Sequence, residues 1–178
     1  LAAAALRDAM ARRAAENFLT QVCLQANRDI CAYARRNRSP LMGSTAVMLA
    51  MDGDSAEVVN LGDSRTFLLR AGRLEQISTD HTDATMLERF GTKGRKPRLT
   101  QHLGIPPEEM VIEPARWWGS IYPDDMFLLC SDGLTDMVPI EEITRLLSTS
   151  VDVAACANAL VATALAGGGR DNVTVIVC

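Results

Sequence analysis

The sequence has few aromatic residues, no excess of positive charge and no long apolar run. Aromatic residues make up 4% of the 178 residues, and the formal net charge at pH 7 is −4. Such a chain offers neither stacking platforms nor a broad basic surface, so we expect no nucleic-acid partner. No apolar run approaches the roughly 20 residues that a membrane-spanning helix requires, so we expect no membrane partner either.

Cysteine and histidine are too sparse and too scattered to build a disulfide framework or a zinc site. The five cysteines are odd in number, show no C-x-x-C spacing, and lie mostly in apolar patterns typical of buried thiols. This usage fits a reducing compartment, so we predict a cytoplasmic protein. His81 and His102 lie far apart in sequence without spaced partner ligands, and we interpret both as surface or hydrogen-bonding residues.

The length and the apolar fraction of 48% suit a single domain over residues 1–178, which we expect to be monomeric. Residues 1–37 contain no Pro or Gly and carry apolar residues at helical spacing, which predicts one or two helices. The basic cluster that follows is interpreted as a solvated helix end, with docking of a phosphoprotein as the less favoured alternative. The chain opens at Leu1 inside this pattern without an initiator Met, so we expect that residues upstream of Leu1 were removed or are missing from this sequence.

Beyond Gly43 the pattern changes to short apolar runs separated by turn residues. An antiparallel meander of four strands is predicted at 45–51, 56–61, 66–70 and 74–78. The remaining expected elements are a helix at 84–90, a basic loop at 93–98, strands at 110–117, 126–130 and 173–177, and helices at 139–147 and 153–166. This order favours an α+β fold with antiparallel sheet.

Two aspartates flank the last two predicted strands. In "FLLCSDGLTDMV", Asp132 follows the strand at 126–130, whereas in "GGGRDNVTVIV", Asp171 precedes the strand at 173–177. If the strands pair antiparallel, both carboxylates reach the same rim of the sheet. Each aspartate alone also suits an ordinary turn, but together they indicate a cation site, which Asp80 in "STDHTD" could join. Ligation by carboxylate oxygens favours Mg²⁺ or Mn²⁺.

The chain resembles the metal-dependent serine/threonine protein phosphatases of the PPM/PP2C type, particularly compact bacterial members. The resemblance is carried by segments in the typical order and spacing, namely "GSTAV", "VVNLGDSRTFLLRAGRL", "TDHT", "RLTQHLGI", "FLLCSDGLTDMV" and "GGGRDNVTVIV". It implies a four-layer αββα sandwich of two antiparallel sheets flanked by helix pairs, with two or three Mn²⁺ or Mg²⁺ ions at one end. Asp132 and Asp171 match metal-ligand aspartates, Asp80 matches a third-metal ligand, and residues 82–100 match the flap beside the active site.

The implied reaction is hydrolysis of phosphoserine and phosphothreonine on proteins by a metal-activated water, with no catalytic residue beyond the metal ligands. The expected partners are phosphorylated proteins, including substrates of a eukaryotic-type Ser/Thr kinase. One departure from the family pattern is that the N-terminal strands carrying an Asp-Gly-x-Gly-Gly-His-type motif are missing. Two alternatives follow: a truncated phosphatase that is impaired as written, which we favour, or a catalytically inactive regulatory or protein-binding module.

Overall fold

The structure is a computed structural model that describes residues 17–39, 42–89, 96–150 and 152–178. Its helices are α2 (Phe18–Arg36), α3 (Ala84–Arg89), α4 (Asp132–Thr135), α5 (Ile140–Thr149) and α6 (Val153–Ala166). Its strands are β1 (Ala46–Asp52), β2 (Ser55–Leu61), β3 (Arg65–Arg70), β4 (Arg73–Gln76), β5 (Ala115–Ser120), β6 (Met126–Cys130) and β7 (Val175–Val177). The first 16 residues of the helical segment predicted at 1–37, and residues 93–95 of the predicted basic loop, lie outside the described residues.

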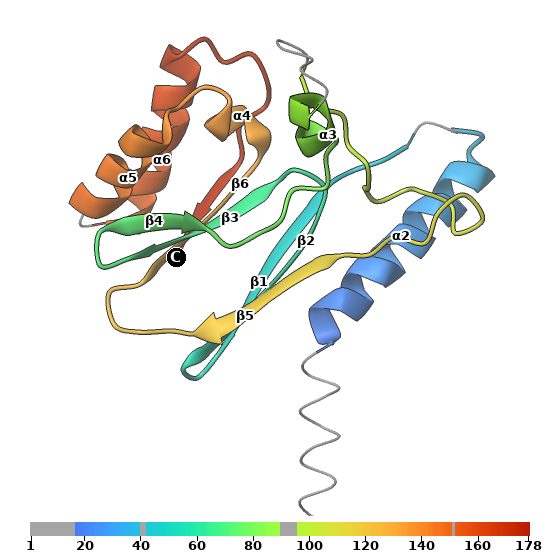
Figure 1. Cartoon of the computed structure of the whole chain (residues 1–178), viewed down its shortest axis with the longest axis horizontal. Coiled ribbons are helices and arrows are strands. Elements are labelled where there is room, and N and C mark those ends of the chain that lie inside the picture. The colour runs from blue at the N-terminus through green and yellow to red at the C-terminus, as the bar shows by residue number, and fades with distance from the viewer. Residues whose placement is uncertain (1–16, 40–41, 90–95, 151) are drawn as a thin grey trace, which may run out of the picture.

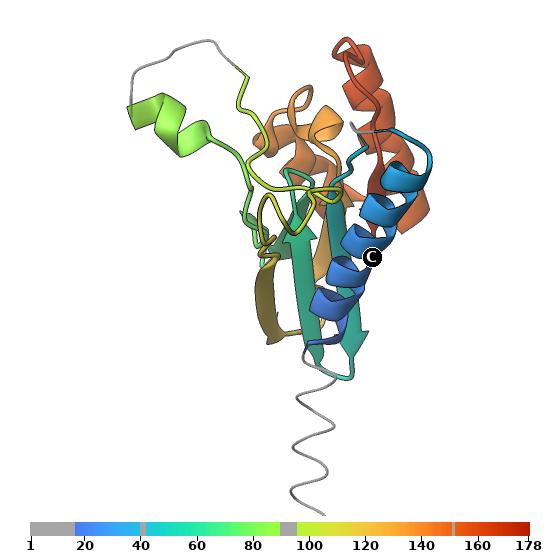
Figure 2. The same ribbon diagram turned by 90° about the vertical axis from the view of Figure 1, so that its right-hand side faces the viewer.

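The strands form two antiparallel sheets, ordered β1-β2-β5 and β4-β3-β6-β7. Figure 1 shows α2 on the outside of the first sheet and α5 and α6 on the outside of the second. In the perpendicular view of Figure 2, α3 stands apart from the sheets, and none of its residues is buried. Among the described helices, none is both long and apolar enough to cross a membrane.

Three apolar cores separate the four layers. Leu19 and Cys23 of α2 pack against Val59 and Leu61 of β2. On the other side of the molecule, buried residues of β3 and β6 pack against α5 and α6. Between the sheets lies a third core, to which each sheet contributes; its buried members are Ala56, Leu68, Phe127 and Leu129.

Alternation along the strands explains how one strand serves two cores. Successive side chains of a strand point to opposite faces of its sheet. In β6, Phe127 belongs to the core between the sheets, whereas Leu128 belongs to the core beneath α5 and α6. A strand covered on both faces is therefore apolar throughout, and Phe127 to Cys130 are all buried. This layering confirms the predicted αββα sandwich, while the absence of N-terminal strands stays a prediction.

The single four-stranded meander predicted at 45–78 is wrong. β2 pairs with β1 and β5, whereas β3 pairs with β4 and β6, so the chain passes from one sheet to the other between β2 and β3. Gly62 makes this turn with a φ of +107°, a conformation that favours glycine. His81 holds the turn: its Nδ1 accepts from the Gly62 N–H at 3.2 Å, and its own N–H donates to the Gly62 carbonyl at 2.9 Å.

The strand predicted at 110–117 is also displaced: β5 begins only at Ala115, directly after Pro114. Pro114 has no N–H to donate to a ladder, which disfavours a continuous strand through this position. Val111, whose apolar character suggested a strand, is 74% exposed. The apolar run before the proline is therefore a loop rather than a strand, and it contributes Ile112, which is 5% exposed, to the core beneath α2.

Candidate functional site

Asp132 lies where β6 ends and the short helix α4 begins. The preceding residue, Ser131, is extended, and its N–H donates to the Thr174 carbonyl at 3.1 Å. Ser131 Oγ donates to the Asn172 carbonyl at 3.2 Å and accepts from the Thr174 N–H at 3.1 Å. These bonds fasten the turn that carries Asp132 to the loop that enters β7.

The loop beside this turn carries Asp171. β6 and β7 are antiparallel, with Cys130 opposite Val175, so the residues after β6 and those before β7 meet at one rim, as predicted. The loop passes so close to Gly133 that a Cβ there would lie 2.3 Å from the Asn172 carbonyl oxygen. Asp171 itself is exposed, and its Oδ1 accepts from the Asn172 N–H at 2.7 Å. Shared coordination of one ion by Asp132 and Asp171 stays a prediction.

Asp80, the third predicted ligand, lies in an ion pair with Arg65. Its Oδ2 accepts from Arg65 Nη2 at 2.6 Å and from Nε at 2.9 Å, and its Oδ1 accepts from Gln76 Nε2 at 2.7 Å. Arg65 Nη1 also donates to Thr135 Oγ1 at 2.8 Å, which ties Asp80 to α4. Since these bonds occupy most of the lone pairs of the carboxylate, Asp80 would have to give up a partner to bind a metal. Its role as a ligand stays a prediction.

Replacing Arg65 by Met is expected to lower the free energy of unfolding by about 1–3 kcal/mol, because it leaves the Asp80 carboxylate without its positively charged partner. Both side chains are mostly buried, with 28% and 20% exposed. Urea unfolding monitored by circular dichroism measures the loss. Arg145→Met, which breaks an exposed pair with Glu142 on α5, is the matched control and is expected to leave the free energy of unfolding close to that of the wild type. Equal losses in the two variants would contradict a structural role for the Arg65 pair.

Lys96, which the resemblance placed in the flap beside the active site without a role of its own, contacts Asp132 directly. Its Nζ lies 2.9 Å from Asp132 Oδ2 and 3.0 Å from Asp136 Oδ2. Two features of the sequence indicated such a contact. Asp132 and Asp136 are four residues apart at the start of a helix, so their side chains lie on the same face. Residues 93–98 are rich in basic residues.

Asp63, in the turn between the sheets, belongs to the same electrostatic neighbourhood. Burial raises the pKa of its carboxyl, and the charges of Asp132 and Asp80 raise it further, against the opposing effects of its backbone hydrogen bond and Lys96. Asp63 therefore lies close enough to Asp132, Asp80 and Lys96 for their charges to act on its carboxyl.

The two histidines are engaged in hydrogen bonds, as the sequence predicted. The ring of His81 accepts from Gly62 at Nδ1, so its Nε2 carries the proton and donates to the Glu113 carbonyl at 3.2 Å. His102 Nδ1 lies 2.8 Å from the Leu103 carbonyl.

The donor chemistry at this rim fits Mg²⁺ or Mn²⁺, because the available side-chain ligands are carboxylate oxygens. The ammonium of Lys96 on Asp132 shows that this position attracts a positive charge. Over the described ranges, however, no three acidic, histidine or cysteine side chains gather closely enough to hold a metal ion by themselves. A divalent cation at Asp132 would therefore need further donors besides this carboxylate.

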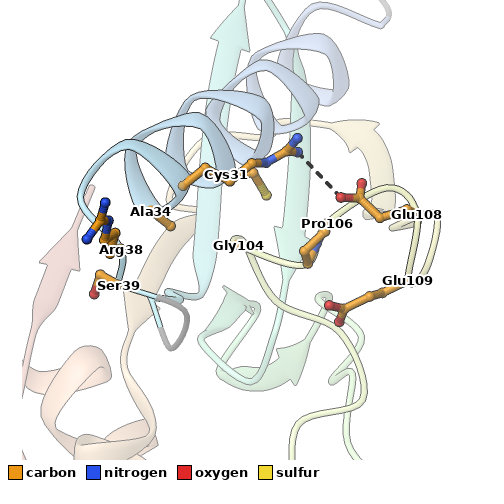
Figure 3. Close-up of a pocket in the computed structure, with 9 residues that line it drawn as sticks. Cys31, Ala34, Arg38, Ser39, Gly104, Pro106, Glu108 and Glu109 are labelled. Carbon is orange, nitrogen blue, oxygen red and sulfur yellow. Dashed lines mark ion pairs between the residues drawn. The ribbon is translucent and has the colours of Figure 1, made fainter.

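A cavity of about 430 Å³ lies elsewhere, between the C-terminal end of α2 and residues 104–109 (Figure 3). Cys31 and Ala34 of α2 line it, and an ion pair of 3.8 Å joins Arg35 to Glu108 across it. Both members of this pair are about two-thirds exposed, so the pair adds little stability. None of the candidate ligand aspartates lines the cavity.

The molecule is thus a four-layer αββα sandwich that gathers aspartates at one rim of its sheets. A family model described as "Protein phosphatase 2C" matches residues 2–91, just over half of the chain. The chain belongs to the protein phosphatase 2C family.

Individual relatives agree with this assignment. The chain is 32% identical over 170 residues to the serine/threonine phosphatase stp of Listeria monocytogenes, covering 90% of this chain and 66% of that protein. A crystal structure of a bacterial serine phosphatase superposes with a TM-score of 0.82 at 30% identity, covering 92% of this chain and 68% of that one. The catalytic domain of the phosphatase PstP in complex with two manganese ions superposes with a TM-score of 0.73 at 34% identity, covering 85% and 65%. The chain therefore spans just under two thirds of the Listeria phosphatase.

Proposed function

We propose that this protein is a metal-dependent phosphatase that hydrolyses phosphoserine and phosphothreonine in other proteins, with residues 1–178 in one domain. Membership of the protein phosphatase 2C family supports the reaction type, and the relatives named as serine/threonine phosphatases support the substrate class. The manganese complex of PstP supports Mn²⁺ as the cofactor, with Mg²⁺ as the alternative. The structural observation that carries the proposal is the bonding of the Asp132 turn to the Asp171 loop.

In this proposal Asp132 and Asp171 hold the cation, and Asp80 contributes to a weaker third-metal position. When bound, the divalent cation would supply a positive charge that acidifies water and offsets the charge of a phosphoryl group. Ser131 keeps the two ligand-bearing segments in register, and Arg65 links Asp80 to α4. These residues orient the ligands and do not themselves react.

A cysteine nucleophile is disfavoured even though Cys130 lies two residues from Asp132. Burial raises the pKa of the Cys130 thiol to about 12. Since the thiolate is the reactive form, Cys130 is inert near neutral pH. Three of the other four cysteines, Cys23, Cys31 and Cys156, are buried too.

The test is release of phosphate from a phosphothreonine peptide, with a phosphotyrosine peptide as the substrate control. Hydrolysis should require Mn²⁺ or Mg²⁺, stop with EDTA, resume on adding excess Mn²⁺, and survive iodoacetamide. The assay should compare the 178-residue chain with the complete gene product, since the relatives are longer. No metal-dependent release from either form would overturn the proposal and favour the inactive regulatory or protein-binding module.

The finer assignments belong to the same proposal. We place the protein in the cytoplasm as a monomer, acting on phosphoproteins that include substrates of a eukaryotic-type Ser/Thr kinase. The cysteines support a reducing compartment, because all five are free in the structure.

A further inference from the structure

Lys96 occupies the place where a cation would approach Asp132. Its single ammonium group lies 2.9 Å from one carboxylate and 3.0 Å from another, although 36 and 40 residues separate Lys96 from Asp132 and Asp136. A lysine ammonium is positively charged at neutral pH. The contact therefore neutralises, from within the chain, part of the negative charge that the rim concentrates.

The backbone around Lys96 is anchored independently of this contact. The Arg98 N–H donates to Asp83 Oδ1 at 2.7 Å, and the Asp83 N–H donates to the Arg98 carbonyl at 3.0 Å. The Thr100 N–H donates to the His81 carbonyl at 2.8 Å. These bonds fasten residues 98–100 to residues 81–83, so the chain directly after Lys96 keeps its place even when the ammonium leaves the carboxylates, and the ammonium acts at a high local concentration.

We propose that Lys96 and the divalent cation compete for the Asp132 carboxylate, so that the cation-free protein holds Lys96 on Asp132 and cation binding displaces it. The inference rests on the proposed function, because it takes Asp132 as a cation ligand. The physical reason is that the Lys96 ammonium lies 2.9 Å from Asp132 Oδ2, so a divalent cation bound to the same carboxylate would lie close to it and repel it. Lys96 is thus a competitor of the cation for Asp132 that belongs to the chain itself.

The competition should be modest. The Lys96 side chain is 60% exposed, and exposed ion pairs contribute little, so removing it should strengthen cation binding about two- to fivefold. Calorimetric titration with MgCl₂ compares the wild-type chain with Lys96→Gln at constant ionic strength. Arg89→Gln, at the exposed end of α3, removes the same charge without touching α4 and should leave the affinity within about 1.5-fold of wild type.

A second readout follows the displacement itself and does not depend on activity. The sequence contains only two lysines, Lys93 and Lys96, so selective labelling of lysine with ¹³Cε and ¹⁵Nζ gives two signals, which Lys96→Gln assigns. On titration with Mg²⁺, the Lys96 signal should move toward that of a free lysine, with the midpoint equal to the calorimetric one. NaCl at matched ionic strength should cause a smaller and non-saturating shift.

The outcomes separate the two proposals. Mg²⁺ binding with an unmoved Lys96 signal, or with equal affinity in wild type and Lys96→Gln, overturns the competition and leaves the phosphatase proposal intact. Absence of Mg²⁺ and Mn²⁺ binding in both proteins overturns the competition together with the cation site on which it rests.

Discussion

Replacing Asp132 by Asn is expected to lower Mn²⁺-dependent phosphate release by at least about 100-fold while the chain keeps its fold. Asparagine preserves the shape but removes the negative charge with which a carboxylate binds a divalent cation, and comparable losses follow even from changes beside metal ligands. The fold should survive because the backbone carbonyl of Asp132, and not its side chain, accepts from Asp136 N–H at 2.8 Å and from Thr135 Oγ1 at 3.3 Å. Initial rates at saturating Mn²⁺ and a thermal melt measure the two effects.

The matched control is Asp136→Asn, which changes the other carboxylate that contacts Lys96. It removes an equal charge 3.0 Å from the same ammonium, yet Asp136 is not a predicted ligand. Its rate at saturating Mn²⁺ is expected to stay within about twofold of wild type, because surface substitutions away from special features have small effects. If Asp132→Asn kept most of its rate, Asp132 would not be a cation ligand. Equal losses in both variants would instead implicate the overall charge of the rim.

The sequence predicted the strands and helices well where local pattern decides them. The apolar run at 126–130 is buried on both faces and matches β6 residue for residue, and the helix predicted at 153–166 matches α6. The assignment of strands to sheets failed because it depends on contacts between distant residues. The bonds between Gly62 and His81, 19 residues apart, turn the chain into the second sheet, and no local pattern encodes them.

The candidate site shows the same division. The antiparallel pairing of β6 with β7 follows from the order of the motifs, and it brings the turns of Asp132 and Asp171 together as predicted. The ion pairs of these aspartates could not be predicted from the motifs. Arg65 is 15 residues from Asp80 and Lys96 is 36 residues from Asp132, so only the folded chain brings the partners together. Because carboxylates gathered at one rim repel one another, positively charged partners could be expected there. Which basic residues provide these partners could not be predicted from the sequence.

Gly133→Ala is expected to damage stability and activity together, because Gly133 sets the spacing between the segments that carry the proposed ligands Asp132 and Asp171. An added Cβ would lie 2.3 Å from the backbone oxygen of Asn172, so the loop that carries Asp171 must move. Overpacking against backbone typically costs about 1–3 kcal/mol, and a misplaced ligand should lower Mn²⁺-dependent turnover at least about tenfold. Chemical denaturation and steady-state rates measure both effects.

The control for this prediction is Gly53→Ala, in the turn between β1 and β2. Gly53 has a φ of +54°, and a Cβ there would meet nothing within 4 Å, so alanine costs only the backbone strain of about 1–2 kcal/mol. It should therefore lower stability by an amount similar to Gly133→Ala while leaving turnover unchanged. That contrast separates loss of stability from loss of geometry. Wild-type turnover in Gly133→Ala would show that the close approach of Asn172 to Gly133 does not position the reacting groups. That result would contradict the proposal that the active site lies at the rim shared by Asp132 and Asp171.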